Sequence, residues 1–301
     1  MNTLPYCFFP TKVMGIGNID NRYLSPYQAL DNLTKTVTSP IFFDRLTTEG
    51  HDLFDLSSLN YLYEEIYNLR RYETVSCLVY HEKNLSQKSL SFLEEFDAIQ
   101  AQKILVTQNK DEKAVITAFN EGLINFYVWA QDPQAPFLLN EFIQQSQHHY
   151  FRNFVNALID PLLEKWQQDH NTLSPLLDPV FIEFFQAFIK THHITEYYLL
   201  DITGSFLLLD YEKQASVFFV FNEQSFREHG QAVDRFLHSN HCLPAEIVED
   251  LKSRRQTICF PFIYPSGPVH VERYIEPVQA LQGQHNYYIA HSKGIDYLKE
   301  F

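Results

Sequence analysis

Side chains that could bind a metal or catalyse acid–base chemistry occur at two places in the second half of the sequence. His238 and His241 are spaced so that they can share one helical face, and Cys242 follows directly. A structural zinc site needs four ligands, and no further Cys/His pair follows at a familiar spacing. Asp201 and Asp210 could act as general acid and base only if both faced one cleft. Their places beside predicted hairpin turns favour turn formation instead, so we expect neither a metal site nor an enzyme.

Glycine, which phosphate-binding loops and nucleophile elbows require, is scarce in this chain. Only 9 of the 301 residues are glycine, against an average usage of about 7%. No phosphate-loop motif, nucleophile elbow or His-Glu-x-x-His motif is present. Gly15-Ile16-Gly17 is nearest to a dinucleotide motif but lacks its third glycine. We therefore expect no nucleotide and no other cofactor.

The charge of the chain excludes further classes of partner. Lys and Arg number 23 against 37 Asp and Glu, which leaves a formal net charge of −14. Phosphate contacts dominate nucleic-acid binding, and anionic lipid surfaces also attract basic residues, so neither partner is expected.

The sequence has no apolar run of about 18 residues and no export signal, so we expect neither a membrane span nor export. The four cysteines form no Cys-x-x-Cys pair and indicate buried thiols in a reducing cytoplasm.

The elements that must position any site alternate between strand and helix in the first half. Four short apolar runs are typical of strands buried on both faces, and amphipathic segments separate them. This order predicts a parallel sheet covered by helices, that is, an α/β domain. The predicted strands are Thr11–Ile16, Val75–Tyr80, Lys103–Thr107 and Ile124–Trp129, and the predicted helices are Tyr27–Leu33, Leu56–Leu69, Leu85–Phe96 and Asp111–Gly122.

A longer helix is predicted to begin at Phe137. Its apolar residues keep an approximate helical stripe, and the helix is long enough to outgrow a small sheet. We interpret residues 137–170 as a connecting helix whose stripe could also serve as a dimerisation surface. The stripe consists of Leu139, Ile143, Tyr150, Phe154 and Leu158.

The pattern changes to successive hairpins after about residue 171. A helix at Phe181–Ile189 precedes three strands with short turns and then two helices. Three further strands are expected at Thr257–Tyr264, Val269–Ile275 and Tyr287–His291. This order predicts an α+β, mainly antiparallel domain of about six strands over residues 171–301, with the order of elements of PAS-type sensory domains. Residues 1–136 then form the α/β domain. The run Phe218–Phe221 and the run Phe260–Tyr264 could line an apolar ligand cavity, but core packing explains them better.

Several segments in the first half resemble the receiver domain of bacterial two-component response regulators, in an atypical subgroup related to quorum-sensing response regulators. The resemblance covers roughly residues 12–155. It implies a flavodoxin-like fold. The matching segments are Ser25–Leu30, Arg70–Ser76, Lys103–Thr107, Asp111–Phe126 and Asp132–Pro133.

The resemblance also implies where the phosphorylation chemistry of a receiver would be located. A receiver uses an aspartate at the end of its third strand as phosphoacceptor, beside carboxylates that hold Mg²⁺; here His81 takes that position and Glu82 follows it. The switch threonine is retained as Thr107. The lysine that follows the fifth strand of a receiver and pairs with the phosphoryl oxygen would fall at Ala130. The acidic pair is represented at best by Asp20. A second alignment leaves out the first strand and helix altogether.

These replacements predict a pseudo-receiver that cannot be phosphorylated on aspartate. His81 could accept phosphate on its imidazole, although local hydrogen bonding is the simpler role, and Glu82 is expected to be solvated. We expect a non-enzymatic signalling protein that contacts a histidine kinase or another regulator and forms a homodimer. The alternatives are a sensor that binds an apolar small molecule in the second domain and an enzyme of unrecognised type.

Overall fold

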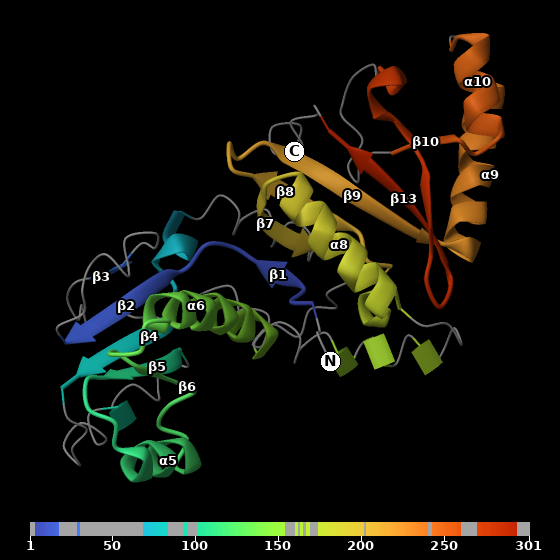
Figure 1. Cartoon of the computed structure of the whole chain (residues 1–301). Coiled ribbons are helices and arrows are strands. Elements are labelled where there is room, and N and C mark those ends of the chain that lie inside the picture. The colour runs from blue at the N-terminus through green and yellow to red at the C-terminus, as the bar shows by residue number, and fades with distance from the viewer. Residues whose placement is uncertain are drawn as a thin grey trace. The chain divides into compact units, whose positions relative to one another are not determined.

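The structure is a computed structural model that divides into two compact units (Figure 1). One unit comprises Phe9–Asp52 and Asn60–Ala157, and we call it the parallel unit. The other comprises Met1–Phe8, Leu53–Leu59 and Leu158–Phe301, and we call it the antiparallel unit. The residues that the structure describes are 4–17, 29–30, 69–83, 93–94, 101–153, 160–161, 163–164, 167–168, 174–201, 203–239, 243–259 and 270–293.

A five-stranded, all-parallel sheet forms the centre of the parallel unit. Its strand order is the 2-1-3-4-5 order of flavodoxin-like folds. The first strand of that order is present, and it pairs with the second and third strands on its two sides. In sheet order the strands are β3 (Ala29–Leu30), β2 (Lys12–Gly17), β4 (Val75–Glu82), β5 (Gln102–Thr107) and β6 (Phe126–Trp129).

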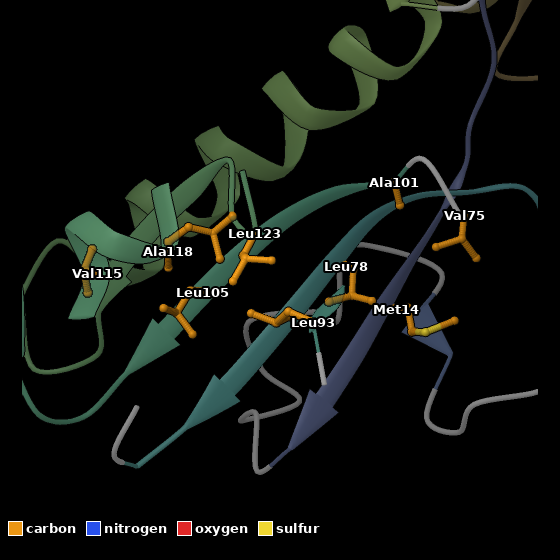
Figure 2. Packing of buried hydrophobic residues seen from close by; sticks show 10 residues of the cluster. Met14, Val75, Leu78, Leu93, Ala101, Leu105, Val115, Ala118 and Leu123 are labelled. Atoms are coloured by element: carbon orange, nitrogen blue, oxygen red, sulfur yellow. The ribbon is translucent and has the colours of Figure 1, made fainter. Parts of the chain in front are cut away.

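Buried side chains cover both faces of this sheet. On β4, Leu78 belongs to one apolar cluster, whereas Cys77 and Val79 belong to the other, as the alternation of a strand requires. Helix α5 (Glu112–Asn120) covers the first face, and helix α6 (Ala135–Phe151) covers the second. Figure 2 shows the first cluster, in which the α5 side chains lie against the strands. The unit is therefore a three-layer α/β sandwich, as predicted.

Helix α5 lies within the predicted range Asp111–Gly122, and the two residues that bound this range fix its ends. The Asp111 carboxylate accepts a hydrogen bond from the backbone N–H of Ala114 at 3.1 Å and caps the first turn. Gly122 follows the helix with a φ of +70°, which only glycine adopts without strain. The helix is therefore fixed at both ends by its own sequence.

The antiparallel unit is built on a six-stranded sheet with helices on both faces. Phe218 contacts Phe185 and Phe188 of α8 (Pro179–Thr191), whereas Phe221 contacts Phe226 of α9 (Glu223–Ser239). Because residues 218 and 221 point to opposite faces, the two helices cover opposite sides of the sheet (Figure 1). In sheet order the strands are β1 (Cys7–Phe8), β7 (Ile194–Leu199), β8 (Phe206–Asp210), β9 (Ala215–Asn222), β13 (Asn286–Ser292) and β12 (Gln279–Gln282).

The described elements outside these sheets complete the α+β architecture. Helix α10 (Ala245–Lys252) packs on α9 and on β10 (Gln256–Ile258), which pairs with β11 (Ile275–Pro277). Shorter 3-10 helices are η1 (Leu69–Glu73) and η4 (Pro175–Leu177). No helix in the described part of the chain is long and apolar enough to span a membrane.

Four features of the fold differ from the sequence-based expectations. Residues 29–30 form strand β3, where the sequence predicts helix, because they pair with β2. The strand expected at Val269–Ile275 is largely a 3-10 helix, η5 (Val271–Tyr274), followed by β11. Strand β12 is not predicted, since its residues lack an apolar pattern. The opening residues also form part of the antiparallel unit, through β1.

Candidate functional site

The carboxyl edge of the parallel sheet brings together most residues of the expected phosphoacceptor pocket. His81 lies opposite Gly17 on one side and Val106 on the other, and Glu82 lies opposite Thr107. Ala130 follows directly after Trp129, which lies opposite Thr107. All these strands are parallel, so their carboxyl ends meet at one edge. Asp20 lies outside the described residues.

The backbone of His81 lies close to Gly17 at this edge. A Cβ atom on Gly17 would lie 2.1 Å from the carbonyl oxygen of His81, and Gly17 has a φ of +91°. Only glycine therefore fits at the end of β2. Partial burial of the His81 imidazole lowers its pKa, so the ring is neutral near pH 7.

The Thr107 hydroxyl is buried and committed to its own loop. It donates a hydrogen bond to the carbonyl oxygen of Asn109 at 2.8 Å and lies 3.1 Å from the Tyr127 hydroxyl. The Trp129 indole closes the same loop by donating to the carbonyl oxygen of Gln108 at 3.0 Å. A threonine used in this way holds the loop in place.

The described residues at this edge do not fit a magnesium site. Of the five residues that end the described strands of this sheet, only Glu82 is acidic. One oxygen of its carboxylate already accepts a hydrogen bond from the Tyr80 hydroxyl at 2.6 Å. Mg²⁺ demands octahedral oxygen ligands. Among the described residues, no three His, Cys, Asp or Glu side chains gather as a metal site would require.

A buried lysine that sequence reasoning missed does not replace the lysine absent at Ala130. Lys103 is 5% exposed and donates a hydrogen bond from Nζ to the carbonyl oxygen of Leu93 at 2.9 Å. It precedes Thr107 by four residues on β5, which corresponds to about 13 Å along a strand. Its charge therefore lies toward the opposite end of the sheet.

The stripe on the long helix is partly committed to the core of its own unit. Leu139 and Ile143 are buried in the cluster between α6 and the sheet, and Tyr150 is also buried. Phe154 and Leu158 lie outside the described residues. Phe137, at the start of the helix, is 68% exposed. Helix α6 thus packs on the parallel sheet with the apolar stripe that the sequence analysis proposed as a dimerisation surface.

The remaining sequence candidates take structural roles. The Asp201 carboxylate accepts hydrogen bonds from Thr203 and Ser205, and the Asp210 carboxylate accepts them from the backbone of Glu212 and Gln214, so both form turns. The His238 imidazole contacts the carbonyl of its own helical turn. His241 and Cys242 lie outside the described residues. Cys7, Cys77 and Cys259 are buried, and none of the three forms a disulfide.

Two fully buried carboxylates in the antiparallel unit were also missed. Asp178 caps α8 and accepts hydrogen bonds from the backbone of Gln284 at 2.7 Å and from the Tyr287 hydroxyl at 2.9 Å. The Asp-Pro pair that opens α8 is a recognised start signal and could have identified it. Glu196 pairs with Lys213 and accepts a hydrogen bond from Tyr198 at 2.8 Å, and no sequence signal marks it.

Comparisons with known proteins support the fold. No protein-family model matches the chain, and no curated protein does. The solved structure of the response regulator LqsR from Legionella pneumophila is similar with a TM-score of 0.66 and 24% identity, over 97% of this chain and 90% of that one. A putative pilus assembly-related protein from Burkholderia pseudomallei has a TM-score of 0.28 and 11% identity, over 46% of this chain and 90% of that one. A TM-score this low does not indicate a shared fold.

The similarity to LqsR extends over both units and matches what the sequence indicates for the first. The parallel sheet has the strand order of a receiver, and an antiparallel α+β unit accompanies it in the same chain. The resemblance to response regulators is thereby confirmed at the level of the fold. This chain has the fold of the response regulator LqsR, with a flavodoxin-like parallel unit and an antiparallel α+β unit.

Proposed function

We propose that this chain is a non-enzymatic signalling regulator whose parallel unit is a pseudo-receiver and acts by contact with other proteins. The observation that carries the proposal is the composition of the carboxyl edge. The resemblance to receivers assigns His81 to the position of the acceptor aspartate and Ala130 to that of the lysine, and both residues belong to this edge. Neither side chain can form or stabilise an aspartyl phosphate. The partner would be a histidine kinase or another regulator.

An exposed apolar patch on α5 supports a role in protein contact. Ile116 is 58% exposed and Phe119 is 41% exposed, and their spacing places them on one side of the helix. Large apolar side chains that are exposed together often mark an interaction surface. Homodimerisation, which is part of the proposal, would use the exposed Phe137 on α6, because Leu139 and Ile143 already face the core.

No specific observation favours the apolar-ligand sensor. Phe218 and Phe219 are almost completely buried, and their rings contact neighbouring aromatic rings. The side chains of Phe218 and Phe219 therefore fill the core. The run Phe260–Tyr264 lies outside the described residues.

The test is phosphoryl uptake by the full chain from acetyl phosphate with Mg²⁺, followed by intact mass spectrometry. We expect no added phosphoryl group. His81→Ala is the matched variant, because it removes the one imidazole at the acceptor position. Stable labelling that is lost in His81→Ala would show that the imidazole is the acceptor and would contradict the proposal. Base-labile labelling that persists in that variant would reveal an aspartyl phosphate elsewhere and would contradict it equally.

A further inference from the structure

A polar cleft in the antiparallel unit has no role in the chemistry discussed above. It lies between the first turns of α9 and the hairpin that joins β12 to β13, and its volume is about 790 Å³. That volume lies within the range of ligand sites, roughly 300–1,000 Å³. We call it the amide cleft. Its lining residues are Asn222, Glu223, Gln224, Arg227, Glu228, Gln231, Gln282, Gly283, Gln284, His285 and Asn286.

Both walls of the amide cleft are held in place by buried contacts. The Asp178 carboxylate accepts the backbone N–H of Gln284, and a Cβ atom on Gly283 would lie 2.3 Å from that carboxylate. The hairpin tip is thus fixed by a side chain that is fully buried. On the other wall, Phe226 of α9 stacks on Tyr288 of β13 with ring centroids 4.2 Å apart. The cleft is therefore built into the fold.

The chemistry of the lining selects a class of ligand. Six of the lining side chains end in an amide, which offers a donor and an acceptor together, as a peptide group does. His285 contributes the one aromatic ring of the lining, and no Trp, Tyr or Phe is present, so the cleft lacks the broad aromatic surfaces on which a sugar or a nucleobase is usually stacked. Among the described residues, the side chains of Arg227, Gln231 and Gln282 have no hydrogen-bond partner. Their donors and acceptors are available to a ligand.

The strand that leads into the amide cleft has an open edge. In the described part of the chain, β12 pairs only with β13 and stands last in the sheet. The backbone N–H of Val278 donates to Arg255, so the open edge begins at Gln279. Its four residues, Gln279–Gln282, are uncharged and mostly exposed. An uncharged edge strand is a template for pairing with a further strand.

We propose that the β12 edge and the amide cleft together bind an extended, polar peptide segment of a partner protein. The peptide adds a strand beside β12 through main-chain hydrogen bonds. Its polar side chains, or the peptide groups beyond the pairing, bond to the amides of Gln231 and Gln282. The site belongs to the antiparallel unit, so it does not depend on the pseudo-receiver, and the two proposals can fail separately.

The test is a titration of the ¹⁵N-labelled full chain with an acetylated and amidated peptide of alternating serine and threonine, observed by NMR. We expect saturable shifts of the backbone amides of Gln279–Gln282 and of the side-chain amides of Gln231 and Gln282. The double variant Gln231→Ala, Gln282→Ala should bind about tenfold more weakly, as the loss of two hydrogen bonds implies. Gln134→Ala, an exposed glutamine of the parallel unit, is the control and should bind like the parent chain.

Two comparison probes make the result decisive. An alternating alanine–leucine peptide of the same length should bind more weakly, because the cleft offers it no apolar lining. Trehalose should leave the β12 backbone amides unshifted. Equal shifts with trehalose would assign the cleft to a sugar and overturn the proposal. The absence of shifts with the serine–threonine peptide at millimolar concentration would overturn it too, as would unchanged binding by the double variant.

Discussion

The two units differ in where their acidic side chains lie. In the antiparallel unit, Asp178 and Glu196 are completely buried, and each carboxylate has a hydrogen-bond or ion-pair partner that joins distant segments. In the parallel unit, the edge that would need carboxylates for phosphoryl chemistry has His81 and Ala130 where the resemblance to receivers predicts the aspartate and the lysine. A buried carboxylate costs several kcal/mol unless its partners satisfy it.

This difference indicates that acids are kept where they hold the fold together. The antiparallel unit depends on Asp178 to fix a helix start and a hairpin with one side chain. The parallel unit holds its carboxyl edge with a glycine, a threonine and an indole, none of which carries charge. The predictions below test this contrast in order of expected effect.

Removal of the Asp178 carboxylate should have the largest effect on stability. Asp178→Ala leaves a buried tyrosine hydroxyl and two backbone N–H groups without their acceptor, which should cost about 4 kcal/mol in the free energy of unfolding. Urea unfolding followed by circular dichroism measures it. Asp210→Ala, in an exposed turn, is the matched control and should cost about 1 kcal/mol. Equal losses would mean that the buried network contributes nothing special.

The glycine at the carboxyl edge should give the next largest effect. Gly17→Ala places a Cβ atom against the His81 carbonyl, and the left-handed φ adds strain, for a combined cost of about 3 kcal/mol. Gly122→Ala is the matched control, because Gly122 also has a positive φ but no atom within 4 Å of its added Cβ. That variant should lose only about 1 kcal/mol. Equal losses in urea unfolding would show that the contact with His81 is not tight.

The histidines of the two units should differ in how they couple stability to pH. Burial, together with Lys293 and His192 nearby, lowers the pKa of His291 to about 3. Below about pH 6.5 the His291 side chain binds a proton in the unfolded chain but not in the folded chain. The free energy of unfolding therefore decreases as the pH is lowered, by up to about 1.4 kcal/mol per pH unit. Above that pH the contribution of His291 is fully present.

The pH effect can be assigned with two variants. His291→Asn removes the titrating group, and the slope of stability between about pH 6.5 and 5 should decrease markedly. His81→Asn should change the same slope less, since His81 is only partly buried, whereas His291 contacts Phe188 and His192. Urea midpoints across this range measure both. A slope that His291→Asn leaves unchanged would refute the assignment.

The smallest effect is expected for the ion pair between the buried Glu196 and the half-exposed Lys213. Glu196→Gln keeps the shape of the side chain but loses its charge pairing with Lys213, whose side chain is about half exposed. Because solvent screens the exposed partner, the loss should be about 1 kcal/mol. A loss as large as that of Asp178→Ala would show that the exposure of Lys213 does not weaken the pair.

Much of the fold could be predicted because local pattern and final structure agree. The apolar run Lys103–Thr107 corresponds to β5, and the cap signals Asp111 and Gly122 flank α5. Strand β3 could not be predicted, since two residues acquire strand geometry only by pairing with β2. Strand β12 has no apolar alternation, because most of it is exposed at a sheet edge.

The candidate site could be predicted in position but not in detail. Parallel strands end at one edge, so residues that end successive strands must lie near one another, and His81, Thr107 and Ala130 do. The bond from Thr107 to the Asn109 carbonyl depends on the path of a loop, which no residue pattern encodes. The buried acid Glu196 escaped notice because its partner, Lys213, lies across a hairpin.

The central claim is that the carboxyl edge of the parallel unit cannot hold a phosphoryl group with its metal. The most direct measurement is an NMR titration of the ¹⁵N-labelled chain with Mg²⁺ and beryllofluoride, which mimics an aspartyl phosphate. The account predicts that the amides of Gly17, His81, Thr107 and Ala130 do not shift. Saturable shifts at these four residues that require both Mg²⁺ and beryllofluoride would contradict it.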